Sequence, residues 1–549
     1  MSSQTVYFNN PADITALQQS NTWSRGQFVS ADLVYTIPAN CWTGPLPGNV
    51  GPAQAVNVYK IVYYSSDSTT TSVQRVSGSL FVPAAGVSKT GSLVLFNKGL
   101  TPGNNTPYTS WETYSNTTLQ AALTAASTNA GAKLDPTSSV SAGYTLFNPC
   151  NLAIWAGYGY IVCDADGFGL GVSQNDIVFN HMSQINPAID YLRCLRNMYS
   201  SNVTAQRAVF NSAVYNADSF PITIAGYSLG ALYTPAIVNE FSAGVSATIP
   251  STEASKFLFK RGLMGAAGEG ETIMSLIANE NIGNYIINAS QSFLFSIVLA
   301  TNPALATLAQ PAALANYWTF WQDVDQKATI LQDIAQIPTL ALYSYESSPP
   351  TAQGTPGFYV PPTQFLGGIY GLTGADFRQI IQPQYTGTVA KILKSNLGWT
   401  NPNRPLYTLP SCSFAHLYST LDEVFLPFGP TGGANANYPQ QAGYNFDSAA
   451  ALDKYMGAGD VGTFYNFTGA GKTKTVTEVS FASDANIGIT TATAAILAAT
   501  TSTTGNNYLR IPVNLDNPAT VALSSHSAFG GTYYATVIGA VLANLTNAN

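Results

Sequence analysis

The sequence has few charged residues. Only 9% of its 549 residues are Asp, Glu, Lys or Arg, against about a quarter in an average soluble protein. The 21 basic and 28 acidic residues leave a formal net charge of −7, and the basic residues are scattered along the chain. Nucleic-acid binding needs lysine and arginine gathered on one face to neutralise phosphates. The composition therefore excludes a nucleic-acid partner.

Long apolar runs are also missing. The longest strongly apolar run, Phe293 to Ala300, is far shorter than the roughly 20 residues needed to cross a bilayer, so we expect no transmembrane segment. The start of the chain lacks the basic and apolar regions of a signal peptide. With so few charges, Ser, Thr, Asn, Gln and Tyr must solvate most of the surface. Such a surface favours an extracellular or periplasmic location.

Cysteine is scarce and unpatterned. The five cysteines are an odd number and include no Cys-x-x-Cys pair, so we expect no metal site. Cys163 and Cys412 lie in apolar strand-like runs and are expected to be buried small hydrophobic residues. Cys41 and Cys150 lie in proline-containing loop sequence, which leaves one disulfide possible.

The sequence does contain an alternation of strand-like and helix-like patterns. A mostly parallel central sheet flanked by helices on both faces has this alternation, so the predicted fold class is α/β. The strands are expected at residues 55–64, 73–82, 92–96, 158–163, 220–225, 257–267 and 411–418, and the helices at 184–198, 229–241 and 531–545.

The alternation stops over a long middle stretch, which predicts an insertion in the α/β core. We expect an N-terminal extension over 1–53, the core over 54–269 and 405–549, and a large, mainly helical lid or cap insertion over 270–404.

The motif Gly226-Tyr227-Ser228-Leu229-Gly230 is a G-x-S-x-G. Five such letters match by chance in a chain this long, but here they follow a predicted buried strand and open a predicted helix. In that setting a serine is held on a sharp turn as a nucleophile. The backbone amide of Leu229 would then point at a developing oxyanion. The alternative is an ordinary Gly/Ser turn between a strand and a helix.

Three histidines could serve the serine as a general base. In this type of sheet the order along the chain is serine, acid, histidine, so His181, which precedes Ser228, is excluded. His416 lies inside an apolar run, as a buried strand histidine would. His526 lies in a loop of small residues ahead of the last predicted helix, and it is the predicted base.

An acid and a second oxyanion donor complete the candidate site. Asp422 or Glu423 follows the strand predicted at 411–418 and would orient the imidazole; Asp422 is favoured because Asp is the shorter and commoner partner. The backbone amide of Leu100, after Gly99, is the candidate second donor. A plain strand-ending glycine is the alternative there.

Four motifs in this order resemble those of the α/β-hydrolases, and within them those of the secretory lipases and esterases. They are LVLFNKGLTPGNNTP, GYGYIVCDADGFGLG, GYSLG, and LDEVFLP with the later SSHSAFG. The resemblance covers about residues 55–269 and 411–549. It implies the α/β-hydrolase fold and hydrolysis of carboxylic esters, including acylglycerols. The group commonly has His-Gly where this chain has Lys98-Gly99, so the resemblance does not extend to the substrate.

Ser228, Asp422 and His526 together predict acyl transfer to water, without a cofactor or a metal. The substrate would be a small-molecule or lipid ester, and the sequence does not indicate an oligomeric state. The same triad also suits an acyltransferase or a peptidase, and a surface protein could keep the scaffold for binding alone. The apolar stretch Tyr285 to Leu308 would either line an acyl pocket under the cap or form the core of the insertion.

Overall fold

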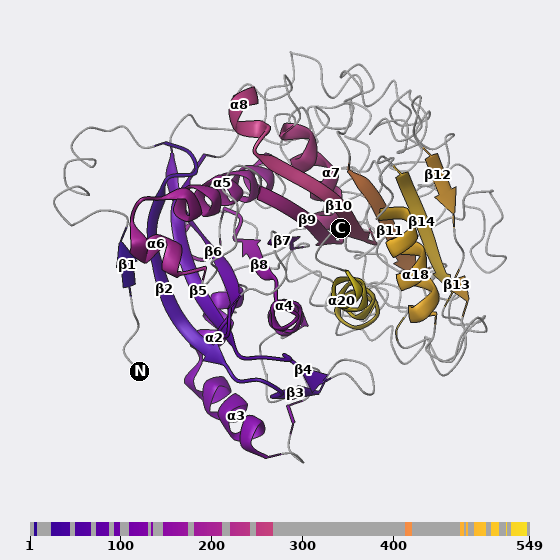
Figure 1. Cartoon of the computed structure of the whole chain (residues 1–549), viewed down its shortest axis with the longest axis horizontal. Coiled ribbons are helices and arrows are strands. Elements are labelled where there is room, and N and C mark those ends of the chain that lie inside the picture. The colour runs from indigo at the N-terminus through magenta and orange to yellow at the C-terminus, as the bar shows by residue number, and fades with distance from the viewer. Residues whose placement is uncertain are drawn as a thin grey trace, which may run out of the picture.

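A computed structural model of the chain shows one large mixed sheet with helices on both faces (Figure 1). The structure describes residues 5–7, 24–43, 50–66, 73–86, 93–98, 109–129, 133–134, 147–168, 170–173, 181–210, 220–241, 249–266, 412–419, 473–476, 479–480, 488–500, 507–514, 523 and 529–545. The insertion predicted at 270–404 lies outside these residues.

The strands of the main sheet follow the order β1-β2-β5-β6-β8-β7-β9-β10-β11-β14-β12, with β13 also pairing with β14, and β3 and β4 form a separate pair. Their bounds are β1 Thr5–Tyr7, β2 Phe28–Ile37, β3 Trp42–Thr43, β4 Val50–Gly51, β5 Val56–Ser65, β6 Gln74–Pro83, β7 Leu93–Asn97, β8 Ile161–Ala165, β9 Phe220–Tyr227, β10 Phe257–Gly265, β11 Ser413–Ser419, β12 Thr473–Val476, β13 Val479–Ser480 and β14 Asn507–Asn514.

The described helices lie on the two faces of this sheet. They are α2 Ser110–Ser115, α3 Thr117–Thr128, α4 Phe147–Gly157, α5 His181–Ser200, α6 Thr204–Ala208, α7 Leu229–Glu240, α8 Ser251–Ala254, α18 Ile489–Thr500, the π-helical turn η6 Phe529–Tyr534 and α20 Ala535–Asn544. Helices α5 and α7 pack together on one face, and α4 and α20 pack together on the other (Figure 1).

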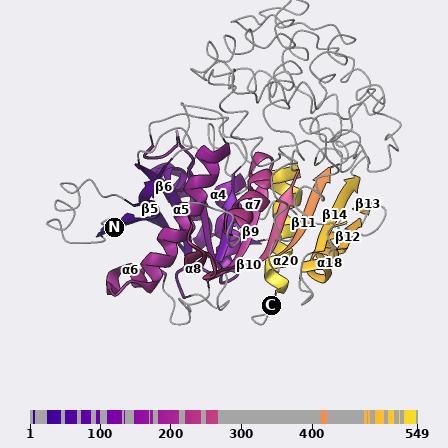
Figure 2. The same cartoon turned by 90° about the horizontal axis from the view of Figure 1, so that it is seen from above.

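The sheet changes character along its length. Strands β1, β2, β5, β6 and β8 pair antiparallel, whereas pairing is parallel from β8 through β7, β9, β10, β11, β14 and β12. Figure 2 shows these strands fanning from β5 and β6 at one end to β12 and β13 at the other. Every residue of β7 is buried, as expected for a parallel strand covered on both faces. The predicted mostly parallel sheet flanked by helices is confirmed.

The segment predicted as an N-terminal extension also contributes to the main sheet. Strand β2 pairs antiparallel with β5 over Phe28 to Ile37, and β1 pairs with the outer edge of β2. The antiparallel end of the sheet therefore begins before residue 54.

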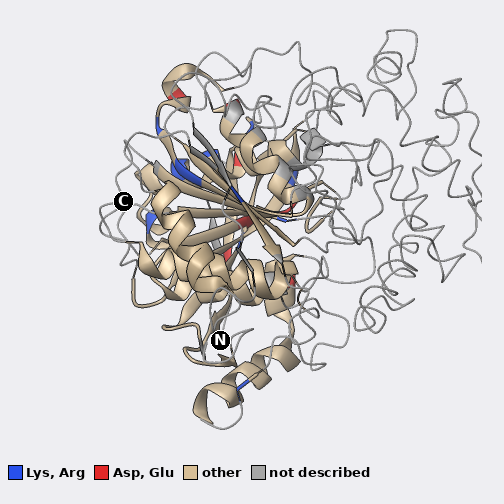
Figure 3. Ribbon diagram, turned by 90° about the vertical axis from the view of Figure 1, so that its right-hand side faces the viewer, with Lys and Arg blue, Asp and Glu red and all other residues tan. Residues whose placement is uncertain are grey.

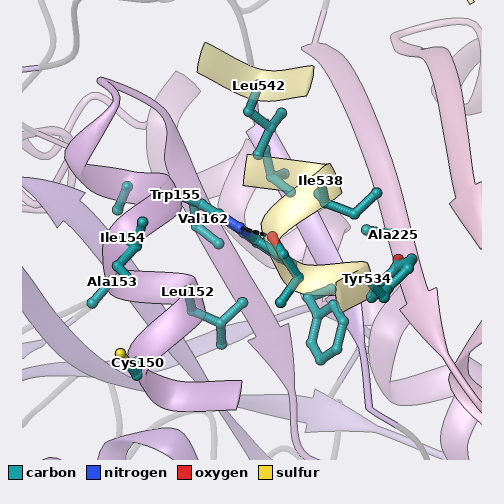
Figure 4. Packing of buried hydrophobic residues seen from close by; sticks show 14 of the residues in the cluster. Cys150, Leu152, Ala153, Ile154, Trp155, Val162, Ala225, Tyr534, Ile538 and Leu542 are labelled. Atoms are coloured by element: carbon teal, nitrogen blue, oxygen red, sulfur yellow. Dashed lines mark hydrogen bonds between the residues drawn. The ribbon is translucent and has the colours of Figure 1, made fainter. Parts of the chain in front are cut away.

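An apolar core fills the space between the sheet and the helices α4 and α20 (Figure 4). Trp155 of α4 packs edge-on against Phe96 of β7, with ring centroids 5.7 Å apart. Its indole nitrogen Nε1 donates a hydrogen bond to the carbonyl oxygen of Ala535, at 3.3 Å. A buried tryptophan with its N–H satisfied packs without a desolvation penalty. This contact joins the first third of the chain to its last described helix.

All five cysteines are buried, and none of them forms a disulfide. The disulfide considered between Cys41 and Cys150 is therefore absent, and both residues belong to the apolar core instead. Burial raises the pKa of the Cys41 thiol to about 12, which disfavours the thiolate that disulfide formation requires. Cys163 and Cys412 are fully buried, as predicted.

Candidate active site

Ser228 occupies a strained turn between β9 and α7. Its φ is 58°, a left-handed conformation that is costly for a residue with a side chain and that concentrates at functional sites. Its amide donates to the carbonyl oxygen of Gly265 at 2.8 Å, and its carbonyl accepts from the amide of Ala231 at 3.0 Å. The strand, strained serine and helix together form the turn that was predicted from the G-x-S-x-G motif.

The two glycines of the motif are required by close packing of the main chain. A Cβ atom at Gly226 would overlap the main chain of Gly230. A Cβ atom at Gly230 would overlap the carbonyl oxygens of Asn97 and Lys98, at the end of β7. Only glycine permits such an approach. We call this turn, Gly226 to Gly230, the elbow. It packs directly against the backbone that follows β7.

A short hydrogen-bond chain fastens this packing. The side-chain amide of Asn97 donates to Thr234 Oγ1 at 3.3 Å, and that hydroxyl donates to the carbonyl oxygen of Gly230 at 3.1 Å. Asn97 is buried at the end of β7, and Thr234 is buried in α7. The strand end and the helix that follows the serine are thus tied together.

The elbow lies where the chain reverses its direction across the sheet. Strand β7 lies between β8, the next strand in sequence, and β9, the one after. The connections on the two sides of β7 therefore leave opposite faces, and the carboxyl ends of these strands open at a topological switch point. In open α/β sheets, ligands bind at such a point. Ser228 follows the carboxyl end of β9 there.

Three buried charged residues lie at the same edge; we call Lys98, Asp164 and Asp166 the elbow cluster. Lys98 Nζ is 3.0 Å from Asp164 Oδ2 and 2.6 Å from Asp166 Oδ1. The lysine side chain is 7% exposed and both carboxylates are fully buried. Charged side chains are sparse on the described part of the chain (Figure 3), so this gathering stands out.

The cluster carries more negative than positive charge. Burial alone lowers the pKa of Lys98, but Asp164 and Asp166 outweigh that effect and raise its pKa, so the ammonium is retained. Burial raises the pKa of Asp164, Lys98 lowers it and Asp166 raises it, and the net pKa is above the usual range. Lys98 is thus bound between the two carboxylates.

Hydroxyl and indole groups also donate hydrogen bonds to the two carboxylates. Ser110 Oγ donates to Asp164 Oδ2 at 2.8 Å. Ser77 Oγ and Trp111 Nε1 donate to Asp166 Oδ2, at 2.7 and 3.0 Å. Among the described residues, no hydrogen-bond donor reaches the buried Asp164 Oδ1, which is consistent with its raised pKa.

Two of the predicted site residues lie in the described part of the chain. Ser228 stands at the elbow, and Leu229 is the first residue of α7. An amide in the first turn of a helix has no carbonyl partner within the helix, and the positive end of the helix dipole lies there. Leu229 N–H is therefore placed to stabilise a negative oxygen. Leu100, Asp422, Glu423 and His526 lie outside the described residues.

The other two histidines lie on β11 and α5. His416 is buried in β11, in register with Met264 of β10, which is in register with Gly226 of β9. Two strand spacings separate His416 from β9, about 10 Å. A side chain that far along the sheet is out of hydrogen-bonding reach of the serine. His181 is the first residue of α5.

The residues that support the elbow were not predicted from the sequence. The partners of Lys98 lie more than sixty residues away in sequence, and Tyr534, which contacts the elbow, lies 308 residues from Gly226. The run CDADGFGLG contains both aspartates. Two carboxylates ending a buried strand next to a lysine that ends another were the available signal.

Within the described residues, no group of three or more His, Cys, Asp or Glu side chains could hold a metal ion. None of the described helices is long and apolar enough to cross a membrane.

No protein-family model and no curated protein sequence matches the chain. Among solved structures, it is similar to the rice cell wall degrading esterase LipA from Xanthomonas oryzae, with 12% sequence identity over 94% of this chain and 97% of that chain and a TM-score of 0.42. It is also similar to Candida antarctica lipase A in its closed state, with 12% identity over 76% of this chain and 73% of that chain and a TM-score of 0.34. At this level of similarity, neither structure says anything about the activity or the substrate of this chain.

Proposed function

We propose that this chain is a serine hydrolase that cleaves carboxylic esters through an acyl-enzyme. The observation that carries the proposal is Ser228, held at a φ of 58° between β9 and α7 at the carboxyl edge of a mostly parallel sheet. A strained serine in that position presents its hydroxyl at the carboxyl edge of the sheet, next to the amides of a helix N-terminus, and Ser228 is 8% exposed there. This geometry suits nucleophilic attack on an acyl carbon.

In the proposed mechanism, Ser228 Oγ attacks the ester carbonyl while His526 accepts the serine proton and Asp422 holds the imidazole. The amides of Leu229 and Leu100 donate to the oxyanion of the tetrahedral intermediate. His526 then gives the proton to the leaving alcohol, and the acyl group stays on the serine. Water, activated by the same imidazole, releases the acid.

The substrate would be a small-molecule or lipid ester, and the cap predicted at 270–404 would select its acyl chain. Each methylene of a bound acyl chain buried on apolar surface would contribute about 0.8 kcal/mol. A series of p-nitrophenyl esters of rising chain length measures this preference. If replacing Phe293 with Asp lowers kcat/KM equally for acetyl and octanoyl esters, the cap does not select the chain.

The proposal is tested by the reactivity of Ser228. We expect a fluorophosphonate to label the wild-type chain once, at Ser228, and to abolish hydrolysis of p-nitrophenyl esters. Ser228→Ala should fold normally and lose turnover by several orders of magnitude, because the nucleophile is gone. Ser200→Ala is the matched control, since Ser200 is exposed at the end of α5, and it should keep full activity.

The outcomes separate the alternatives. Retention of a tenth of the wild-type activity by Ser228→Ala would refute the assignment of the nucleophile. Labelling of Ser228 without ester hydrolysis would indicate an acyltransferase or a peptidase. Failure of the wild-type chain to react at all would indicate a binding protein on this scaffold.

A further inference from the structure

Tyr534 is the last residue of the π-helical turn η6, and its hydroxyl reaches into the sheet at the base of the elbow. It donates a hydrogen bond to the carbonyl oxygen of Leu263 in β10, at 2.7 Å. It accepts one from the amide of Gly226 in β9, at 3.2 Å. The side chain is 1% exposed. One hydroxyl thus joins the two strands that frame the serine.

This bridge occupies a particular rung of the ladder between β9 and β10. The amide of Ser228 bonds directly to the carbonyl oxygen of Gly265. Two residues earlier on both strands, the corresponding groups are the Gly226 amide and the Leu263 carbonyl, and Tyr534 Oη binds both of them. The first glycine of the elbow is therefore held by a side chain that belongs to neither strand, in addition to its pairing with β10.

Ring packing surrounds this bridge. The rings of Tyr534 and Tyr227 have centroids 5.3 Å apart. A Cβ atom at Gly265 would overlap both rings, and one at Gly530 would overlap the ring of Tyr227. Figure 4 shows Tyr534 next to Ala225 of β9, on the side of the sheet that α20 covers. The fit between η6 and the residue before the serine leaves no space for a side chain at either glycine.

We propose that Tyr534 is a positioning residue for the reaction, fixing the main chain of the elbow, and with it Ser228 and the Leu229 amide, against the π-helical turn η6. The inference rests on the proposed serine hydrolase function. Its basis is the hydroxyl bridge between Gly226 and Leu263 together with the packing of η6 on Tyr227. π-Helical turns are rare and are frequent at functional sites, and η6 follows the predicted base His526 within a few residues.

The test compares Tyr534→Phe with Tyr160→Phe. Tyr160 is also 1% exposed, and its hydroxyl also donates to a main-chain carbonyl, that of Leu542 at 2.8 Å, away from the elbow. Tyr534→Phe loses two buried hydrogen bonds and Tyr160→Phe loses one, so both should lose small amounts of Tm, and Tyr534→Phe somewhat more. We expect only Tyr534→Phe to lower kcat, by about tenfold or more with little change in KM, because a small displacement of the nucleophile costs that much.

A second pair of variants tests the packing. Gly530→Ala forces a Cβ into the ring of Tyr227, whereas Gly539→Ala in α20 places one at an ordinary 3.4 Å from Trp155 Nε1. We expect Gly530→Ala to slow fluorophosphonate labelling of Ser228 and to lower kcat, and Gly539→Ala to do neither. This pair tests whether the packing of η6 on Tyr227 positions Ser228, even if one of the tyrosine variants is unstable.

Labelling of the wild type at Ser228 distinguishes failure of the positioning role of Tyr534 from failure of the proposed function. If the wild type is labelled and hydrolyses esters, but Tyr534→Phe keeps the kcat and labelling rate of Tyr160→Phe, the positioning role is wrong and the proposed function stands. If the wild type is neither labelled nor active, both are wrong. A kcat loss confined to Tyr534→Phe and Gly530→Ala supports the role.

Discussion

Two groups of buried charges in the described part of the chain are built differently. The elbow cluster, Lys98 with Asp164 and Asp166, lies where β7 and β8 end, and its side chains are at most 7% exposed. A second group, which we call the α5 cluster, consists of Arg25, Asp190, Arg193 and Glu253. Its arginines are 15 to 16% exposed, and only Asp190 is fully buried.

The charges balance in one cluster and not in the other. In the α5 cluster, Asp190 accepts from Arg25 Nε at 2.8 Å and from Arg193 Nη1 at 3.2 Å, and Glu253 pairs with Arg193 at 2.6 Å. Two cations meet two anions there, and they tie the segment before β2 and the helix α8 to α5. The elbow cluster has one cation for two anions.

Burying an unbalanced charge costs stability, because desolvation exceeds what pairing returns. Natural proteins keep such arrangements mainly at functional sites. The α5 cluster holds the segment before β2 and helix α8 against α5. The elbow cluster includes Lys98, whose main chain contacts Gly230. The comparison teaches that burial of charge alone does not indicate function, but its imbalance and its place in the sheet do.

The largest effect should come from Lys98→Met. Removing the only cation leaves two buried carboxylates unneutralised, so we expect the free energy of unfolding to fall by about 3–5 kcal/mol. Because the Lys98 carbonyl contacts the elbow, kcat of the folded fraction should also fall, about tenfold. Urea unfolding and ester hydrolysis measure the two. Lys98→Arg, which keeps the charge, should recover part of both.

Asp190→Asn should have a smaller effect and a different kind of effect. The neutral amide keeps the shape but weakens the bonds to Arg25 and Arg193, so we expect a loss of about 1–3 kcal/mol in the free energy of unfolding. Turnover by the folded enzyme should not change. An equal loss of kcat in this variant and in Lys98→Met would erase the distinction between the two clusters.

A pH effect of the same sign is expected from each cluster. Burial raises the pKa of Asp164 and of Asp190 above the usual range, and their cationic neighbours only partly offset it. A carboxyl with a raised folded-state pKa contributes stability that is present below its unfolded pKa, about 3.9, and lost as the pH rises through the folded value. Asp164→Asn should therefore gain stability relative to the wild type as pH rises from about 4 to 7. Thermal melts across that range measure it, and a variant curve parallel to that of the wild type would contradict the raised pKa.

The smallest effect concerns two thiols that adjoin the clusters. Cys163 precedes Asp164, and Cys194 follows Arg193. Burial is the larger cause that raises the pKa of each thiol well above its usual value, and the negative charge of Asp164 or Asp190, respectively, is the smaller cause. Both should resist a thiol reagent in the native protein. We expect Lys98→Met to speed labelling of Cys163 alone, and Asp190→Asn to speed labelling of Cys194 alone. Equal acceleration at both thiols in either variant would mean that the clusters open together.

Much of the parallel half of the sheet could be predicted from the sequence. Apolar runs such as SLVLF and FPITIA predict buried strands, because a strand that is covered on both faces has no side that needs polar residues. The elbow was predictable because a G-x-S-x-G motif after a strand and before a helix is typical of a sharp turn that holds a nucleophilic serine. These are local signals, read within about ten residues.

The supports of the elbow were not predictable, because they are relations between distant residues. Nothing around Tyr534 indicates that its hydroxyl lies between β9 and β10, and Lys98 resembles an exposed loop lysine until the ends of β7 and β8 are placed side by side. Strand β2, with its mixed burial pattern, also gave a weak signal within a segment predicted as an extension.

The hydroxyl bridge of Tyr534 also bears on when the protein becomes competent during its synthesis. Gly226 and Tyr534 are separated by 308 residues, which a ribosome takes roughly 15 to 60 s to add. Throughout that interval the elbow lacks the side chain that bridges β9 and β10. Contacts between residues so distant in sequence form late and slow the search for the native state. In the nascent chain, the main chain around Ser228 therefore lacks the Tyr534 bridge until nearly all of the sheet has been synthesised.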